Sequence, residues 1–137
     1  MTPPAMSRPA RVGIVGCGVI SDQYARNAPA FDSFQLVACA DVDPDAADRL
    51  AAEHGLVAAP LEAVLSDPAI DIVLNLTPPL AHVDVTRQAL VAGKHVYSEK
   101  PLATSLAAAR QIAAAAAAAG VTVCCAPDTV LDRKSVV

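Results

Sequence analysis

The stretch that decides the fold is "GIVGCGVIS", residues 13–21, in which glycines follow a short apolar run. Gly16, Gly18 and Ser21 have the spacing G-x-G-x-x-S, which is typical of the turn from the first strand to the first helix of a dinucleotide-binding fold. The first glycine permits a tight turn, the second lets the backbone approach a pyrophosphate, and the third small residue lets the helix pack closely on the strand. The helix that follows, beginning with Val19 and Ile20, would point its free N–H groups at the phosphates.

The remainder of the chain alternates between apolar runs and segments of helical character. The runs are rich in Val and Ile, as strands buried on both faces are, and cover residues 11–16, 34–42, 70–77, 94–99 and 121–127. Segments with helix start and stop signals cover residues 43–55, 79–93 and 104–120. We also expect a two-residue edge strand near Val57 and a small helix from Leu61 to Leu65. The alternation predicts an α/β fold, a doubly wound parallel sheet of about six strands.

Composition sets the limits of this domain. Residues 1–10 hold three prolines and small polar residues, which offer nothing to bury, so we expect a disordered tail there. Residues 11–127 then form one domain. A run of seven alanines in the last helical segment favours a tightly packed helix, because alanine has the highest helix propensity. Thr104 and Ser105 are both candidates for its N-cap.

Charge and residue content exclude several classes of partner. The net charge is −4 and aromatic residues make up 3% of the chain, which argues against nucleic acid. No apolar run approaches the roughly 18 residues that span a bilayer, and the N-terminus lacks a secretory signal, so we expect a soluble cytoplasmic protein. His54 and His95 have no metal-ligand spacing, and no metal site is predicted. Without a Cys-x-x-Cys pair, we expect free buried thiols at Cys17, Cys39, Cys124 and Cys125.

Asp41, at the end of the second apolar run, is the candidate for recognising a ribose. It lies 25 residues after Gly16, somewhat further than the usual ~20, but at the right place after the second strand. A carboxylate there accepts hydrogen bonds from ribose hydroxyls and repels a 2′-phosphate. Val42 rather than Arg follows, so the sequence favours NAD over NADP. The alternative, a helix-entry acid, suits Asp43 and Asp45 better, and Asp43 before Pro44 is expected to be a turn or cap residue.

Two further segments, "NLTPPLAH" (75–82) and "AGKHVYSEKPLA" (92–103), complete an ordered set of motifs. Together with the glycine loop and the acid after the second strand, they make residues 11–127 resemble the glucose–fructose oxidoreductase / inositol dehydrogenase (Gfo/Idh/MocA) family. The resemblance implies an NAD(P)-dependent dehydrogenase or reductase acting on sugars, inositols or related polyols. It also implies an N-terminal Rossmann domain followed by a larger α/β domain.

The resemblance assigns roles to individual residues. Lys100 of the Glu-Lys-Pro segment matches a lysine in acid–base catalysis beside the nicotinamide, and Glu99 would line the cofactor site. Thr77 and Pro78 match a loop that lies against the cofactor, and His82 matches a histidine in the first turn of the next helix. For His82 a polar surface or capping role is an equal alternative.

The chemistry of alcohol oxidation agrees with a role for Lys100. A base that titrates near neutral pH removes a hydroxyl proton best, so the lysine would need a pKa lowered by desolvation or by a nearby positive charge. Pro101 restricts Lys100 to extended backbone and raises the prospect of a cis peptide bond. The alternative is a surface lysine paired with Glu99.

The end of the chain departs from the family pattern. The family's substrate domain should begin near residue 128, and "DRKSVV" does not resemble it, so we expect residues 128–137 to be the truncated start of a missing domain. Hydride transfer by this chain alone should be weak or absent, because the cleft stays open to water. Two alternatives remain: an NAD-sensing or interaction module without turnover, and a fragment of an NAD-dependent glycoside hydrolase of the same family. No pattern indicates an oligomeric state.

Overall fold

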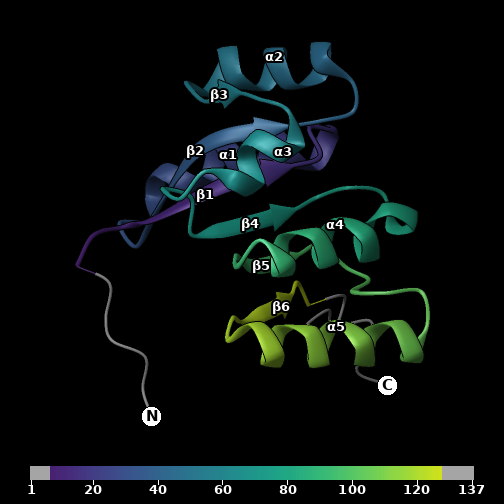
Figure 1. Cartoon of the computed structure of the whole chain (residues 1–137). Coiled ribbons are helices and arrows are strands. Elements are labelled where there is room, and N and C mark those ends of the chain that lie inside the picture. Colours follow the sequence, from purple (N-terminus) through teal and green to yellow (C-terminus); the bar gives the residue numbers. More distant parts are fainter. Residues whose placement is uncertain (1–6, 128–137) are drawn as a thin grey trace, which may run out of the picture.

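A six-stranded parallel sheet organises the molecule. The computed structural model describes residues 7–127, and within them the strand order is β3-β2-β1-β4-β5-β6 (Figure 1). All five strand pairs are parallel. The strands are β1 (Ala10–Val15), β2 (Phe34–Ala40), β3 (Val57–Ala58), β4 (Ile72–Asn75), β5 (His95–Ser98) and β6 (Val123–Cys125). The predicted α/β fold, including the short edge strand at Val57, is confirmed.

Four of the helices match the segments predicted to be helical to within two residues at each end. They are α1 (Val19–Asn27), the 3-10 helix η1 (Ala28–Ala30), α2 (Pro44–His54), α3 (Leu61–Ser66), α4 (Pro79–Val91) and α5 (Leu106–Ala119). Asp43 is the N-cap of α2, as expected, and its carboxylate accepts a hydrogen bond from the Asp45 amide. Of the two candidates for capping α5, Ser105 is the N-cap. Gly55 and Gly120 end α2 and α5 in the left-handed conformation.

The sheet carries helices on both faces, as right-handed crossovers on either side of β1 require. On one face, α1 and α2 cover a core that includes Ile14, Cys39 and Leu50. On the other, α4 and α5 cover a core that includes Val73, Leu90 and Ile112, and α3 packs through Val64. The carboxyl ends of β1 and β4 lie side by side, and this is the point where the strand order reverses. In folds of this kind ligands bind outside the carboxyl ends of the strands at that point.

Two expectations about the periphery need correction. The domain starts earlier than residue 11, because Ala10 is buried within β1 and Arg8 is ion-paired with Asp71. Residues 1–6 and 128–137 lie outside the described part, so the expected tail and the truncated domain start are not tested there. Cys17 and Cys39 are buried as predicted, but Cys124 is exposed and Cys125 is half-buried, because β6 is an edge strand.

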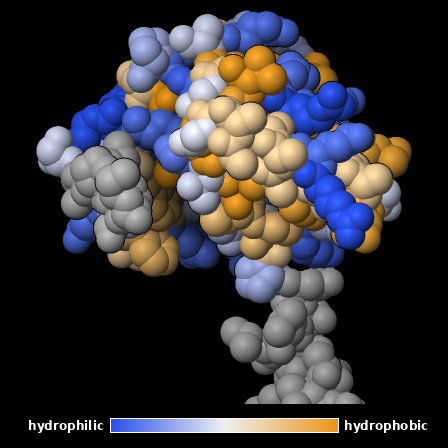
Figure 2. All heavy atoms as spheres, turned by 60° about the horizontal axis from the view of Figure 1, so that its bottom comes forward, coloured by the Kyte–Doolittle hydropathy of each residue, from blue (hydrophilic) through white to orange (hydrophobic). Residues whose placement is uncertain are grey.

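The alanine run forms a helix but is not tightly packed. Within Ala113–Ala119 only Ala116 is buried, because α5 turns a single stripe toward the sheet. Figure 2, which brings the α5 end of the molecule forward, shows hydrophobic residues gathered at the centre of this face. High helix propensity therefore produced the element without requiring its burial. None of the helices in residues 7–127 is long and apolar enough to cross a lipid bilayer.

Candidate functional site

The glycine loop begins with a backbone conformation that only glycine adopts readily. Gly16 has φ +99°, and its N–H donates to the carbonyl oxygen of Ala40 at 2.9 Å. A Cβ atom here would lie 2.6 Å from the carbonyl carbon of Leu76 and 2.7 Å from the amide nitrogen of Thr77. The tight turn predicted at Gly16 is confirmed. The missing side chain also lets the glycine loop touch the segment that leaves β4.

The N-terminus of α1 is open to a ligand. Gly18 is the N-cap residue, no side chain caps the helix, and a Cβ at Gly18 would find no atom within 4 Å. Uncapped amides at a helix N-terminus form an anion site, because they carry free N–H groups and the positive end of the helix dipole. Val19 is 97% exposed and Ile20 is exposed as well, whereas Ser21 is fully buried against the strand as the motif predicts. This loop therefore has the open backbone that a pyrophosphate requires.

Asp41 lies directly after β2 and helps to shape the same loop. Its Oδ2 accepts a hydrogen bond from the Cys17 amide at 2.7 Å, and its Oδ1 accepts one from the Asp43 amide at 2.8 Å. The side chain remains partly exposed, and each carboxylate oxygen has a second lone pair to offer. Asp41 therefore stabilises the glycine loop through these hydrogen bonds and can still accept hydrogen bonds from a ligand beside it.

The segment after β4 brings Thr77 and Pro78 to the same edge of the sheet. The amide and the hydroxyl of Thr77 both donate to Oδ1 of Asn75, at 3.2 and 2.6 Å. Pro78 is the N-cap residue of α4 and is exposed. Neither predicted residue is buried in the core, so both can contact a ligand that lies across the strand ends.

The Glu-Lys-Pro segment follows β5 on this edge. Glu99 Oε2 accepts a hydrogen bond from the Tyr24 hydroxyl of α1 at 2.6 Å, which ties the segment to the opposite side of the site. Burial and this bond to Glu99 hold the pKa of Tyr24 well above its usual value. Lys100 is exposed, and none of the ion pairs within residues 7–127 joins it to Glu99. The Lys100–Pro101 peptide is cis, as the sequence suggested.

His82 is neither a surface residue nor a cap. It is only 1% exposed, and its Nδ1 lies 2.6 Å from the carbonyl oxygen of Pro101. Because a carbonyl only accepts, Nδ1 is the nitrogen that donates this hydrogen bond. Nε2 is buried and has no hydrogen-bond partner within residues 7–127. The surface alternative for His82 is therefore wrong.

His54 and His95 each make a hydrogen bond to another segment of the fold. His54 at the end of α2 bonds through Nε2 to Asp22 of α1 at 2.7 Å, and this bond holds the pKa of Asp22 below its usual range. Asp22 is also ion-paired with Arg26. His95 accepts a hydrogen bond at Nδ1 from the Thr122 amide at 3.0 Å. Asp22 and His54 thus join α1 to α2.

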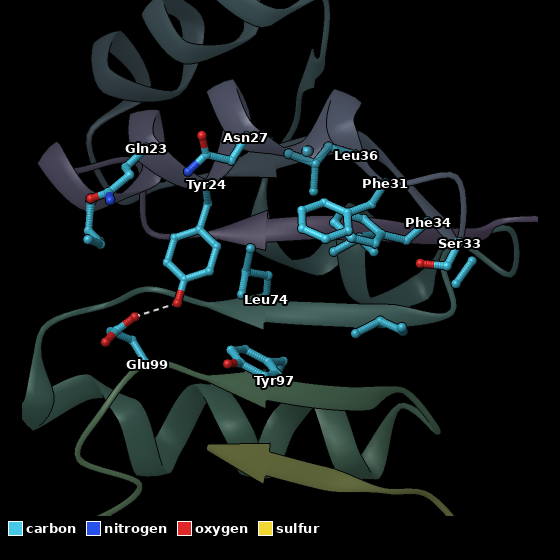
Figure 3. Close-up of a pocket in the computed structure, with 15 residues that line it drawn as sticks. Gln23, Tyr24, Asn27, Phe31, Ser33, Phe34, Leu36, Leu74, Tyr97 and Glu99 are labelled. Carbon is cyan, nitrogen blue, oxygen red and sulfur yellow. Dashed lines mark hydrogen bonds between the residues drawn. The ribbon is translucent and has the colours of Figure 1, made fainter. Parts of the chain in front are cut away.

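A cavity of about 740 Å³ extends from this edge along the α1 face of the sheet (Figure 3). Its walls are mostly apolar: Tyr24 and Phe31 lie on one side, and Leu74 and Tyr97 rise from β4 and β5. Only two of the predicted site residues, Ile20 and Glu99, line it. The cavity therefore adjoins the glycine loop without being the cradle for phosphates.

Sequence reasoning missed two residues of this site. Tyr24 lies on α1 one turn beyond the motif, and nothing in the local pattern links it to Glu99. Asn75 left a signal, because it is a polar residue within the apolar run "IVLNL" of residues 72–76. Tyr24 and Asn75 form the hydrogen bonds that hold the Glu-Lys-Pro segment and the Thr77 loop in place.

The fold and the site together define a dinucleotide-binding domain of the Rossmann type. Residues 10–126 match the family model described as the oxidoreductase family with an NAD-binding Rossmann fold, Gfo/Idh/MocA. The chain belongs to this family of NAD(P)-dependent oxidoreductases, as the motifs suggested.

Several relatives show the range of the family. The chain is 38% identical over 104 residues to a dTDP-3,4-didehydro-2,6-dideoxy-alpha-D-glucose 3-reductase of Saccharopolyspora spinosa, covering 73% of this chain and 31% of the relative. It is 33% identical over 92 residues to an inositol 2-dehydrogenase of Rhizobium meliloti, covering 67% and 28%. The chain thus spans about a third of the length of these curated relatives.

Solved structures agree with the sequence relatives. The 3-ketoreductase KijD10 of Actinomadura kijaniata, in complex with NADP and TDP-benzene, superimposes with a TM-score of 0.82 at 30% identity, over 86% of this chain and 37% of that one. GenD2 from gentamicin A biosynthesis, in complex with NAD, gives a TM-score of 0.82 at 30% identity, over 91% and 37%. One of these two structures contains NADP and the other NAD. The family relationship therefore supports binding of NAD(P) but does not distinguish NAD from NADP.

Proposed function

We propose that this chain is the NAD-binding domain of an oxidoreductase that transfers hydride between the nicotinamide cofactor and a sugar, inositol or related polyol. The observation that carries the proposal is the open N-terminus of α1, which lies between Asp41 on one side and the Glu-Lys-Pro segment on the other. The residues fit the cofactor, because the space beside Gly18 is free and the amides of the first turn of α1 have no side-chain cap.

The dinucleotide would lie across the strand ends. Its pyrophosphate belongs at Gly18 and the first turn of α1, where free amides meet negative charge. The adenosine ribose belongs at Asp41, whose free lone pairs accept from both hydroxyls and whose charge opposes a 2′-phosphate, so we propose NAD rather than NADP. The nicotinamide half then reaches the β4–β5 side, where Thr77, Pro78, His82 and Glu99 lie with Lys100.

Lys100 is the residue proposed to handle the proton. The cofactor, when bound, supplies the acceptor or donor of hydride. In alcohol oxidation the Nζ of Lys100 takes the hydroxyl proton as the C–H hydride leaves, and in carbonyl reduction it returns that proton to the new oxygen. Lys100 is exposed in this chain. It would need the positive charge of the oxidised ring, or cover by other protein, to act as a base near neutral pH.

Binding of NADH, NADPH and ADP-ribose, measured by isothermal titration calorimetry, tests the proposal. We expect saturable binding of NADH, tighter than that of NADPH. We expect the Gly18→Val variant to lose this binding while it keeps the thermal stability of the wild type, because its side chain enters the space left for the phosphates. If no dinucleotide binds at millimolar concentration, the proposal is wrong.

Assays of turnover on a panel of polyols separate the activities that share this cofactor. Production of NADH from an inositol or sugar supports the dehydrogenase, with Lys100→Met as the variant that should abolish it. Saturable binding without turnover supports a chain that needs a further domain, or an NAD-responsive module. Release of an aglycone from a glycoside without net NADH would indicate the hydrolase branch instead.

A further inference from the structure

Asn75, the last residue of β4, is a fully buried amide whose hydrogen-bonding capacity is completely used. Its Nδ2 donates to the carbonyl oxygen of His82 and to the Thr86 hydroxyl, both at 3.0 Å. Its Oδ1 accepts from the amide and hydroxyl of Thr77, at 3.2 and 2.6 Å. The side chain is 0% exposed, so these four bonds are made away from water.

The partners fix both the identity and the orientation of this side chain. The Thr77 amide can only donate and the His82 carbonyl can only accept, so the oxygen of Asn75 must face Thr77 and the nitrogen must face α4. A carboxylate would set oxygen against oxygen at His82, and an apolar side chain would leave buried partners unsatisfied. Among the uncharged side chains, an amide of this length satisfies all of them.

Asn75 is also linked to both sides of the Lys100 segment, once through its backbone carbonyl and once through its side chain and His82. The backbone carbonyl of Asn75 accepts from the Glu99 amide at 2.9 Å, on one side of Lys100. On the other side, the Pro101 carbonyl is held by Nδ1 of His82, the residue whose own carbonyl Asn75 binds. Lys100 itself is exposed and enters no ion pair within residues 7–127. These two bonds, together with the Tyr24–Glu99 bond, anchor the residues on either side of Lys100.

We propose that Asn75 is a positioning residue for the nicotinamide half of the dinucleotide. It acts through the Thr77 loop and through the Lys100 segment, and none of the bonds of its side chain reaches Asp41, the residue proposed for the adenosine half. The inference rests on the proposed function, because it needs a bound dinucleotide. A merely structural core residue would behave differently, because its loss would weaken ligand binding at both halves of the site equally or at neither.

The test compares NADH with ADP-ribose, which lacks the nicotinamide ring. Dissociation constants are measured by calorimetry for the wild type, for Asn75→Leu and for the control Thr86→Val. We expect Asn75→Leu to raise the Kd of NADH on the order of tenfold, the effect of one lost hydrogen bond of ordinary strength, and to leave the Kd of ADP-ribose unchanged. Thr86→Val removes a bond that faces α4 only, so we expect both constants to stay at their wild-type values.

A second variant, His82→Leu, tests separately the link that runs from Asn75 through His82 to the Pro101 carbonyl. His82→Leu keeps every bond of Asn75 and removes only the ring bond to Pro101, so it should raise the Kd of NADH while ADP-ribose binds as before. The inference is wrong if the variants raise the Kd values of NADH and ADP-ribose by the same factor or leave both unchanged. It is also wrong if the wild-type protein binds NADH no better than ADP-ribose. If the wild type binds neither ligand, the proposed function fails, and the inference fails with it.

Discussion

The two halves of the carboxyl edge are built in different ways. On the β1–β2 side, a glycine with positive φ and a partly exposed carboxylate shape a loop whose contacts are mostly with backbone. On the β4–β5 side, buried and half-buried polar side chains hold the loops, and they join residues far apart in the chain: His82 to Pro101, and Tyr24 to Glu99 across 75 positions. The first half joins the ends of the neighbouring strands β1 and β2, whereas the second joins α1, the end of β4, α4 and the segment after β5.

This difference explains where each half is vulnerable. A loop shaped by backbone fails when a side chain is added, because space and φ are the limiting quantities. A loop held by buried polar bonds fails when a side chain is removed, because its partners are left unsatisfied away from water. The variants below probe these two kinds of failure.

The largest effect is expected at the turn of the first half. Gly16→Ala places a Cβ 2.6 Å from the backbone of Leu76 and forces a residue with a side chain to φ +99°. Strain and overpacking together should lower the free energy of unfolding by about 2–5 kcal/mol, measured by urea denaturation. Gly18→Ala is the matched control, because its Cβ meets no atom within 4 Å, and it should unfold like the wild type. Equal stability of the two variants would contradict this account.

A smaller effect is expected from the carboxylate beside that turn. Asp41→Asn keeps one oxygen for the Cys17 amide and removes the charge that opposes a 2′-phosphate. We expect the Kd of NADH to rise about tenfold, as loss of charge-assisted bonds to the ribose implies, and the preference for NADH over NADPH to shrink. Calorimetric titration with both dinucleotides measures the ratio. A parallel change for both would show that Asp41 supports the loop without reading the ribose.

The smallest effect is expected where α1 meets the second half. Tyr24→Phe removes the hydroxyl bond to Glu99 and should cost about 1 kcal/mol of stability, the usual value of one such bond. Because the folded-state pKa of Tyr24 is raised, the stability it contributes is present below about pH 10 and is lost as the pH rises above it.

Urea denaturation at a series of alkaline pH values checks this expectation. The wild type should lose stability above about pH 10 more steeply than Tyr24→Phe does. Some slope should remain in the variant, because burial also raises the pKa of Tyr97. Identical slopes for the two proteins would show that the Tyr24–Glu99 bond does not form in solution.

Much of the fold could be predicted because its signals are local. The strands and helices could be placed from the pattern of apolar residues and from Gly, Pro and Ser at the ends of elements. The caps at Asp43, Gly55 and Ser105 could be predicted from residue type. The errors arose where burial decides. Ala10 joined β1 because pairing with β2 continues to Phe34, and the alanines of α5 stayed exposed because only one stripe of that helix meets the sheet. Helix or strand propensity depends on the residues of one segment, so it does not predict which other segments will pack against it.

The sequence by itself determined the glycine turn, the acid after β2 and the order of the motifs, because each depends on backbone geometry or on spacing along one strand–turn–helix unit. Only the tertiary structure decided that His82 is buried against Pro101, that Tyr24 binds Glu99 and that Asn75 joins two loops. The physical reason is that a buried polar group must find its partners wherever the fold brings them, and the parallel sheet brings together residues that no local pattern connects.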